Sequence, residues 1–128
     1  MVTDKEILKK IEKHFQWLTV NGKHILAIDL KGTTEEEFIA CTQYMRTVTF
    51  QSPFDEIRAV IDLTGIKFTP RMVYYAMQVA KYGSKKVTHK AGIGMGPVVL
   101  ALYRISRMQG NSTRLFNTYD EALKFVSE

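Results

Sequence analysis

Apolar and polar positions near the start of the chain alternate as they do in two paired β-strands. β-prone runs at residues 14–20 and 23–30 flank Asn21-Gly22, and both turn residues tolerate positive φ. This pattern predicts a hairpin with a two-residue turn. The turn length fixes the register of the strands, so we expect Trp17 to face Leu26.

The rest of the chain alternates between helical and strand periods. Thr34 can cap a helix whose apolar positions recur every three or four residues until Ser52-Pro53. Pro70 and Gly83 bound a second helix, over about residues 70–82. Further strands are predicted at residues 57–63, 88–95 and 113–116, and further helices at residues 97–108 and after Thr118. This order predicts an α/β fold with a single, mostly parallel β-sheet, opened by an N-terminal hairpin and covered by helices.

The length of the chain indicates one domain. It has 128 residues and a mass of 14.7 kDa, so we expect a single domain over residues 1–128, with a short N-terminal helical extension at residues 1–13. The one cysteine, Cys41, excludes an internal disulfide and fits a reducing cytoplasm. The longest uncharged apolar run, residues 91–103, is interrupted by glycines and a proline, so no transmembrane segment is expected.

Basic residues are concentrated in the second half of the chain. The formal net charge is +5, and no Asp or Glu occurs between Asp62 and Asp120. That stretch holds nine basic residues: Lys67, Arg71, Lys81, Lys85, Lys86, Lys90, Arg104, Arg107 and Arg114. The positive potential fits either a solvated surface or an anionic partner, such as an acidic protein, an anionic lipid surface or a phosphate-bearing ligand. Sequence-specific nucleic acid is not expected, since no recognition helix or stacking platform is evident.

Three glycines, Gly92, Gly94 and Gly96, lie where a predicted strand meets a predicted helix. Their spacing matches neither the dinucleotide-binding fingerprint nor a P-loop. Backbone N–H groups at such a junction can receive an anion, or the glycines can serve tight turns and close packing. The candidate anion or ligand contacts are these three glycines together with Arg71, Arg104 and Arg107.

The two helices predicted after Pro70 and Pro97 carry more apolar residues than one sheet face can cover. Either the helices bury the surplus against each other, or it forms an exposed patch for a partner subunit or an apolar ligand. The candidate patch comprises Met72, Tyr75, Val79 and Tyr103. Since symmetric dimers are the commonest oligomers, we expect a homodimer.

Residues with catalytic chemistry do not converge in the sequence. His14, His24 and His89 are scattered without metal-ligand spacing, and Cys41 lies in the apolar stripe of a predicted helix. No carboxylate pair, catalytic triad or metal set is recognisable. We therefore predict a protein that is not an enzyme and that has no metal and no cofactor.

Residues 59–70 read Ala-Val-Ile-Asp-Leu-Thr-Gly-Ile-Lys-Phe-Thr-Pro, a predicted strand, a loop and a helix start. In this segment, and in the runs at residues 25–32 and 115–123, the chain resembles anti-sigma-factor antagonist (STAS) domains. It looks most like their SpoIIAA-like branch of small uncharacterised bacterial proteins. The resemblance extends over about residues 14–127. It implies a regulatory or protein-interaction module with a protein partner.

The same resemblance implies a switch and an alternative function. In regulatory STAS domains, a serine or threonine beginning the helix after this strand is phosphorylated, which switches binding to a partner kinase. Phe68-Thr69-Pro70-Arg71 stands here in place of the family's Asp-Ser-Ser-Gly. The candidates for a phospho-switch or helix cap are Thr69, Thr64 and Asp62. STAS domains also look similar to CRAL-TRIO lipid carriers, which implies the alternative of a carrier or sensor of a small apolar or amphipathic anion.

Overall fold

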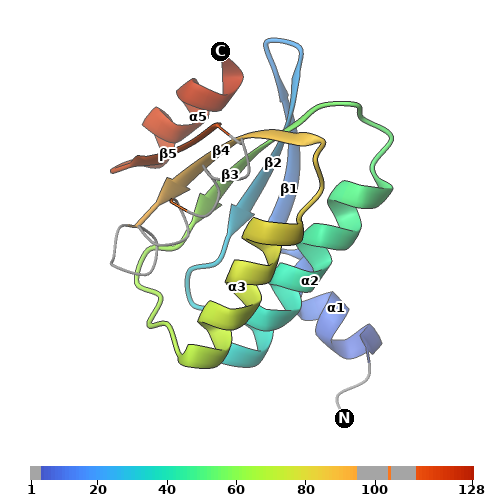
Figure 1. Ribbon diagram of the computed structural model, residues 1–128, viewed down its shortest axis with the longest axis vertical. Coiled ribbons are helices and arrows are strands. Elements are labelled where there is room, and N and C mark those ends of the chain that lie inside the picture. Colours follow the sequence, from blue (N-terminus) through green and yellow to red (C-terminus); the bar gives the residue numbers. More distant parts are fainter. Residues whose placement is uncertain (1–3, 95–103, 105–111) are drawn as a thin grey trace.

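The computed structural model describes residues 4–94, 104 and 112–128, which form an α/β fold (Figure 1). Its elements are α1 (Asp4–Glu12), β1 (Phe15–Val20), β2 (Lys23–Asp29), α2 (Glu35–Gln51), β3 (Ile57–Asp62), α3 (Pro70–Tyr82), β4 (Val87–Ile93), β5 (Ser112–Phe116) and α5 (Tyr119–Ser127). The five strands form one sheet in the order β1-β2-β3-β4-β5. Only β1 and β2 pair antiparallel, which confirms the predicted fold class.

The N-terminal hairpin has the predicted register. Trp17 pairs with Leu26 and Phe15 with Ile28. The two turn residues both have positive φ, 53° at Asn21 and 75° at Gly22. This conformation matches the twist of the flanking strands, so the turn sets the pairing of every residue in the hairpin.

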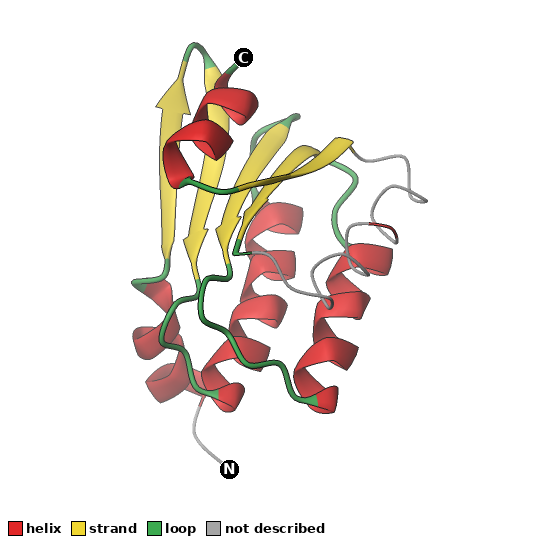
Figure 2. Cartoon of the chain, turned by 90° about the vertical axis from the view of Figure 1, so that its left-hand side faces the viewer, coloured by secondary structure: helices red, strands yellow, loops and turns green. Residues whose placement is uncertain are grey.

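Helices cover both faces of the sheet (Figure 2). On one face, Leu26 and Ala59 pack in a core cluster with residues of α1, α2 and α3. On the other face, the neighbouring residues Ile25 and Val60 pack against α5. Successive strand residues point to opposite faces, so the central strands are apolar at nearly every position.

Threonine caps begin three of the described helices. Thr34 and Glu37 form a capping box at α2, and Thr118 accepts a hydrogen bond from the backbone N–H of Glu121 in α5. Strand β4 begins and ends earlier than predicted. It ends at Ile93 because Gly94 has a φ of +88° that breaks the extended conformation. The helix predicted at residues 97–108 lies outside the described residues, except for Arg104. Among the described helices, none is both long and apolar enough to span a membrane.

Candidate functional site

Asp62 ends β3 at the carboxyl edge of the parallel strands. Its residue is 8% exposed, and its carboxylate accepts hydrogen bonds from the backbone N–H of Thr64 (3.0 Å) and from the Thr64 hydroxyl (2.6 Å). The ammonium group of Lys31 lies 3.4 Å from the other carboxylate oxygen. Asp62 therefore holds the loop that follows β3 in place, and the hydroxyl of Thr64 is engaged in a hydrogen bond with it.

These contacts set the charge state of Asp62. Burial favours the neutral acid, but the two hydrogen bonds from Thr64 and the ammonium group of Lys31 outweigh it and hold the pKa of Asp62 below its ordinary value. The ionised carboxylate thus stabilises the fold above the unfolded-state pKa of about 3.9. This contribution disappears as the pH falls through the lower folded-state pKa.

We expect Asp62→Asn to lower the free energy of unfolding by about 1–2 kcal/mol at pH 7. The loss should shrink as the pH falls below about 4, because the wild-type carboxylate then becomes protonated. Urea denaturation between pH 7 and pH 2 measures both quantities. Asp55→Asn, at an exposed position, is the control and should change little at any pH. An Asp62→Asn deficit that is the same across this pH range would contradict the assignment.

Thr69 joins the first turns of two helices. Its side chain accepts a hydrogen bond from the backbone N–H of Met72 (3.2 Å), so it is the N-cap of α3, and its hydroxyl donates to the carboxylate of Glu35 in α2. Arg71 lies 3.0 Å from the carboxylate of Glu36 and 3.7 Å from that of Glu35. We call these four residues, Glu35, Glu36, Thr69 and Arg71, the α2–α3 junction.

The predicted switch residues therefore fall into two groups. Thr69 belongs to the α2–α3 junction, whereas Thr64 and Asp62 bind each other at the end of β3. The contact between Thr69 and Glu35 joins residues 34 positions apart, so no local pattern in the sequence indicates it. Capping by Thr69 was indicated by the Pro that follows it.

The described glycines of the predicted anion site make close contacts with protein atoms. A Cβ atom at Gly94 would lie 2.5 Å from the backbone nitrogen of Thr64, and one at Gly92 would lie 3.1 Å from a methyl carbon of Leu115. These approaches give both glycines a packing role. Gly96 and Arg107 lie outside the described residues, and Arg104 is exposed.

The basic residues of the acid-free stretch do not form one uniform surface. Arg71 is paired with Glu35 and Glu36, which the acid-rich α2 brings to it. The ammonium group of Lys86 donates to the backbone oxygens of Phe50 and Ser52. Lys90 is only 9% exposed. The expectation that this stretch is positive on its surface is wrong for Arg71, which is paired with carboxylates, and for Lys90, which is buried. Lys86 keeps its charge close to the surface.

The predicted apolar patch on α3 needs a correction. Met72 is 3% exposed and packs in the core cluster between the sheet and the helices. Tyr75 and Val79 are half-buried, and Tyr103 lies outside the described residues. The most exposed aromatic side chains of α3 are Tyr74 and Tyr82.

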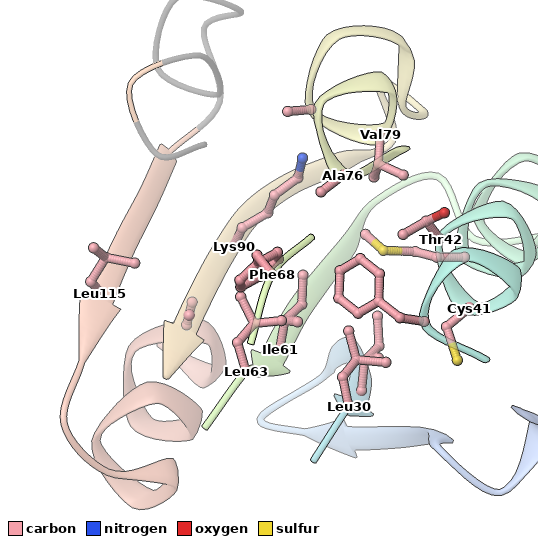
Figure 3. A pocket seen from close by; sticks show the side chains of 16 residues that line it. Leu30, Cys41, Thr42, Ile61, Leu63, Phe68, Ala76, Val79, Lys90 and Leu115 are labelled. Atoms are coloured by element: carbon pink, nitrogen blue, oxygen red, sulfur yellow. The ribbon is translucent and has the colours of Figure 1, made fainter. Parts of the chain in front are cut away.

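An apolar cavity of about 120 Å³ lies between the sheet and helices α2 and α3 (Figure 3). Its walls include Cys41 and Thr42 of α2, Val79 of α3, Leu115 of β5 and Lys90 of β4. Burial, and secondarily the carboxylate of Glu37, raises the pKa of the Cys41 thiol to about 12. The thiol is therefore neutral near pH 7 and is a poor nucleophile.

The histidines lie apart and make separate contacts. His14 Nδ1 is 2.7 Å from the backbone oxygen of Asp29, His24 stacks on Phe54, and His89 lies next to the hydroxyl of Thr88. Over residues 4–94, 104 and 112–128, no group of three His, Cys, Asp or Glu side chains is arranged to hold a metal ion.

Comparisons with known proteins support the fold. No protein-family model matches the sequence, and no curated protein matches it either. The structure is similar to that of an uncharacterised protein of the DUF3478 family with a SpoIIAA-like fold from Shewanella loihica PV-4, with a TM-score of 0.65 and 18% identity. The match covers 88% of this chain and 91% of the other. With its antiparallel hairpin, parallel strands and helices on both faces, the chain has the SpoIIAA-like fold that its sequence resemblance predicted.

Proposed function

We propose that the chain is a regulatory protein-interaction module of the STAS type, and that the α2–α3 junction lies in its contact surface. The SpoIIAA-like fold supports a module of this kind. The observation that carries the proposal is the contact between Thr69 and Glu35 beside the exposed Arg71. A hydroxyl, two carboxylates and a guanidinium group meet there within reach of a partner.

Phosphorylation of Thr69 would change two sets of contacts. The modified side chain cannot donate to Glu35, and its charge of about −2 repels the carboxylates of Glu35 and Glu36. The same phosphate would lie at the positive end of the α3 dipole, close to Arg71. We expect Arg71 to leave the two carboxylates for the phosphate, which changes the charge that the junction presents to a partner.

We expect Thr69→Glu to alter the set of proteins retained in a pull-down from the native cell, and Thr69→Ala to retain the wild-type set. Thr118 provides matched controls, because its hydroxyl also caps a helix and donates to a glutamate. Thr69→Ala and Thr118→Ala should each lower the free energy of unfolding by about 1 kcal/mol. If Thr69→Glu and Thr118→Glu both retain the wild-type partners, Thr69 is only a helix cap.

We also infer that the module is not an enzyme and works in the cytoplasm. The neutral, buried thiol of Cys41 supports the first inference, since it is the strongest potential nucleophile among the described residues. The same free cysteine fits a reducing compartment.

A homodimer is proposed through α3. Tyr74 and Tyr82 are 58% and 59% exposed on the same helix, and Tyr74 makes an edge contact with Tyr75. Light scattering at micromolar concentration should give about twice the chain mass of 14.7 kDa, and Tyr74→Glu should reduce it to a monomer. A wild-type mass near that of one chain would exclude the dimer.

A second function, the carriage or sensing of a small apolar or amphipathic anion, is favoured by the cavity between the sheet and helices α2 and α3. Its apolar walls suit a ligand that water solvates poorly. Native mass spectrometry of freshly purified protein should show a retained ligand. This function and the protein contacts use different residues of α2 and α3, so each can be tested with its own variants.

A further inference from the structure

The volume of the apolar cavity limits the part of a ligand that it can enclose. The volume is about 120 Å³, and an engineered protein cavity of about 150 Å³ binds benzene. The cavity can therefore enclose an apolar body of about six carbon atoms at most. It opens to the surface on one side, so a longer chain can project from it. The walls are formed mainly by aliphatic and aromatic side chains, including Leu30, Phe38 and Ile61.

Among the described residues in the wall of this cavity, Lys90 is the charged one. Its residue is 9% exposed, and Figure 3 shows its side chain extending from β4 toward α3. Among the described residues, no carboxylate forms an ion pair with it. Burial lowers the pKa of Lys90, since the apolar surroundings disfavour its charge. An anion bound beside the amine would compensate that cost.

The other polar groups among the described wall residues do not need a ligand as a hydrogen-bond partner. The hydroxyl of Thr42 donates to the backbone oxygen of Ile39 at 2.6 Å, within its own helix. The Cys41 thiol is neutral near pH 7 and is only a weak hydrogen-bond donor. The described part of the wall therefore combines apolar side chains with one cationic group.

A second void adjoins the first and carries another donor. It has a volume of about 10 Å³, room for roughly one water-sized group, and it shares Met45, Val79 and Lys90 with the larger cavity. Arg46 also lines it. The Nε atom of Arg46 is buried, and no described residue accepts a hydrogen bond from it. Two residues with nitrogen donors thus line the same small space.

We propose that the cavity binds a monocarboxylate and encloses about six carbons of its apolar chain, and that the carboxylate pairs with Lys90 and extends toward Arg46. The proposal rests on the carrier function proposed above and names its ligand class. A neutral ligand would leave the buried ammonium group unpaired. A phosphate ester, with three terminal oxygens, is too large for the one-water void, whereas one oxygen of a planar carboxylate fits it.

Titration calorimetry with the full chain tests the proposal with three probes. Octanoate has both the apolar chain and the negative charge, octanol has the apolar chain without the charge, and acetate has the charge without the chain. We expect the wild-type protein to bind octanoate at least roughly tenfold more tightly than octanol, and to show no binding of acetate. Octanoate and octanol differ only at the head group, so their ratio reports the pairing with Lys90 without any substitution.

Lys90→Met tests the role of the amine, because methionine keeps the length of the side chain without its charge. We expect a roughly tenfold or larger loss of octanoate affinity, and affinity for octanol that is unchanged or higher. Lys85→Met, at an exposed position in the loop before β4, should bind octanoate as the wild type does. The Lys90→Met protein should melt at the wild-type temperature or above, since a buried charge is removed.

Each contrary outcome has a definite meaning. Binding of octanol without a preference for octanoate would leave the carrier function standing and overturn the carboxylate ligand. Failure of both probes to bind would overturn the carrier function as well. Octanoate binding that Lys90→Met leaves unchanged, in a variant whose circular dichroism is that of the wild type, would exclude Lys90 as the head-group partner.

Discussion

Replacing Phe38 by alanine should lower the free energy of unfolding by about 3–5 kcal/mol. Phe38 lies in the first turns of α2 and is 2% exposed, and its ring makes an edge contact with Phe68 at a centroid distance of 5.4 Å. The side chain also lines the apolar cavity. Truncation would add its volume to an existing space, and the surrounding walls cannot close over the enlarged cavity. The loss should therefore lie near the upper end of the range.

Urea denaturation followed by circular dichroism measures this loss. Phe50→Ala is the matched control, since Phe50 lies on the same helix and is 54% exposed. That variant should change the free energy of unfolding by no more than about 0.5 kcal/mol. A Phe38→Ala protein within about 1 kcal/mol of the wild type would show that this core cluster does not stabilise the fold as its burial indicates.

Local signals in the sequence predicted the described elements and their order. Asn21-Gly22 determines a two-residue turn, and the turn determines the register of the hairpin. Thr34 and Pro70 mark where α2 and α3 begin. The first turn of a helix has backbone N–H groups without partners, so it favours a side chain that accepts a hydrogen bond, as in Thr34, or a residue that has no N–H, as in Pro70. Each of these signals acts within a few residues, and a single sequence contains it.

The polar residues inside the fold could not be predicted in the same way. Arg58 stands in the apolar run of β3, and its guanidinium group donates to the backbone oxygen of Val126, 68 residues further along the chain. Its side chain also pairs with Glu56. Arg58 and Val126 meet only because α5 packs on the sheet in the folded protein. The sequence alone therefore does not show why a cationic residue stands in this apolar strand.

The burial of Lys90 was not predicted, because the charge pattern indicated an exposed basic surface. The acid-free stretch predicted a positive surface, and a lysine within it is most simply placed in water. Both faces of β4 are covered, however, so a residue at any position of the strand can be buried. The candidate ligand site therefore follows from the topology of the sheet and from the cavity, neither of which the sequence pattern contains.

Gly94 is the position where a single added methyl group should disturb the backbone most. Its φ of +88° is a conformation that side chains disfavour, and a Cβ atom would lie 2.5 Å from the backbone nitrogen and 2.7 Å from the Cα atom of Thr64. Neither atom belongs to a flexible side chain, so the loop after β3 or the end of β4 must move. We expect Gly94→Ala to lower the free energy of unfolding by about 3–4 kcal/mol, the sum of backbone strain and steric overlap.

Gly65→Ala separates the two contributions, because Gly65 has a φ of +78° and no atom lies within 4 Å of its Cβ position. This variant carries the strain alone and should lose about 1–2 kcal/mol. Urea denaturation of both variants gives the difference, which is the cost of holding the ends of β3 and β4 apart. The loop between β3 and α3 leads to the α2–α3 junction, so Gly94→Ala should also disturb the contact of Thr69 with Glu35. Equal losses for the two variants would mean that the close approach of Gly94 to Thr64 is relieved at no cost.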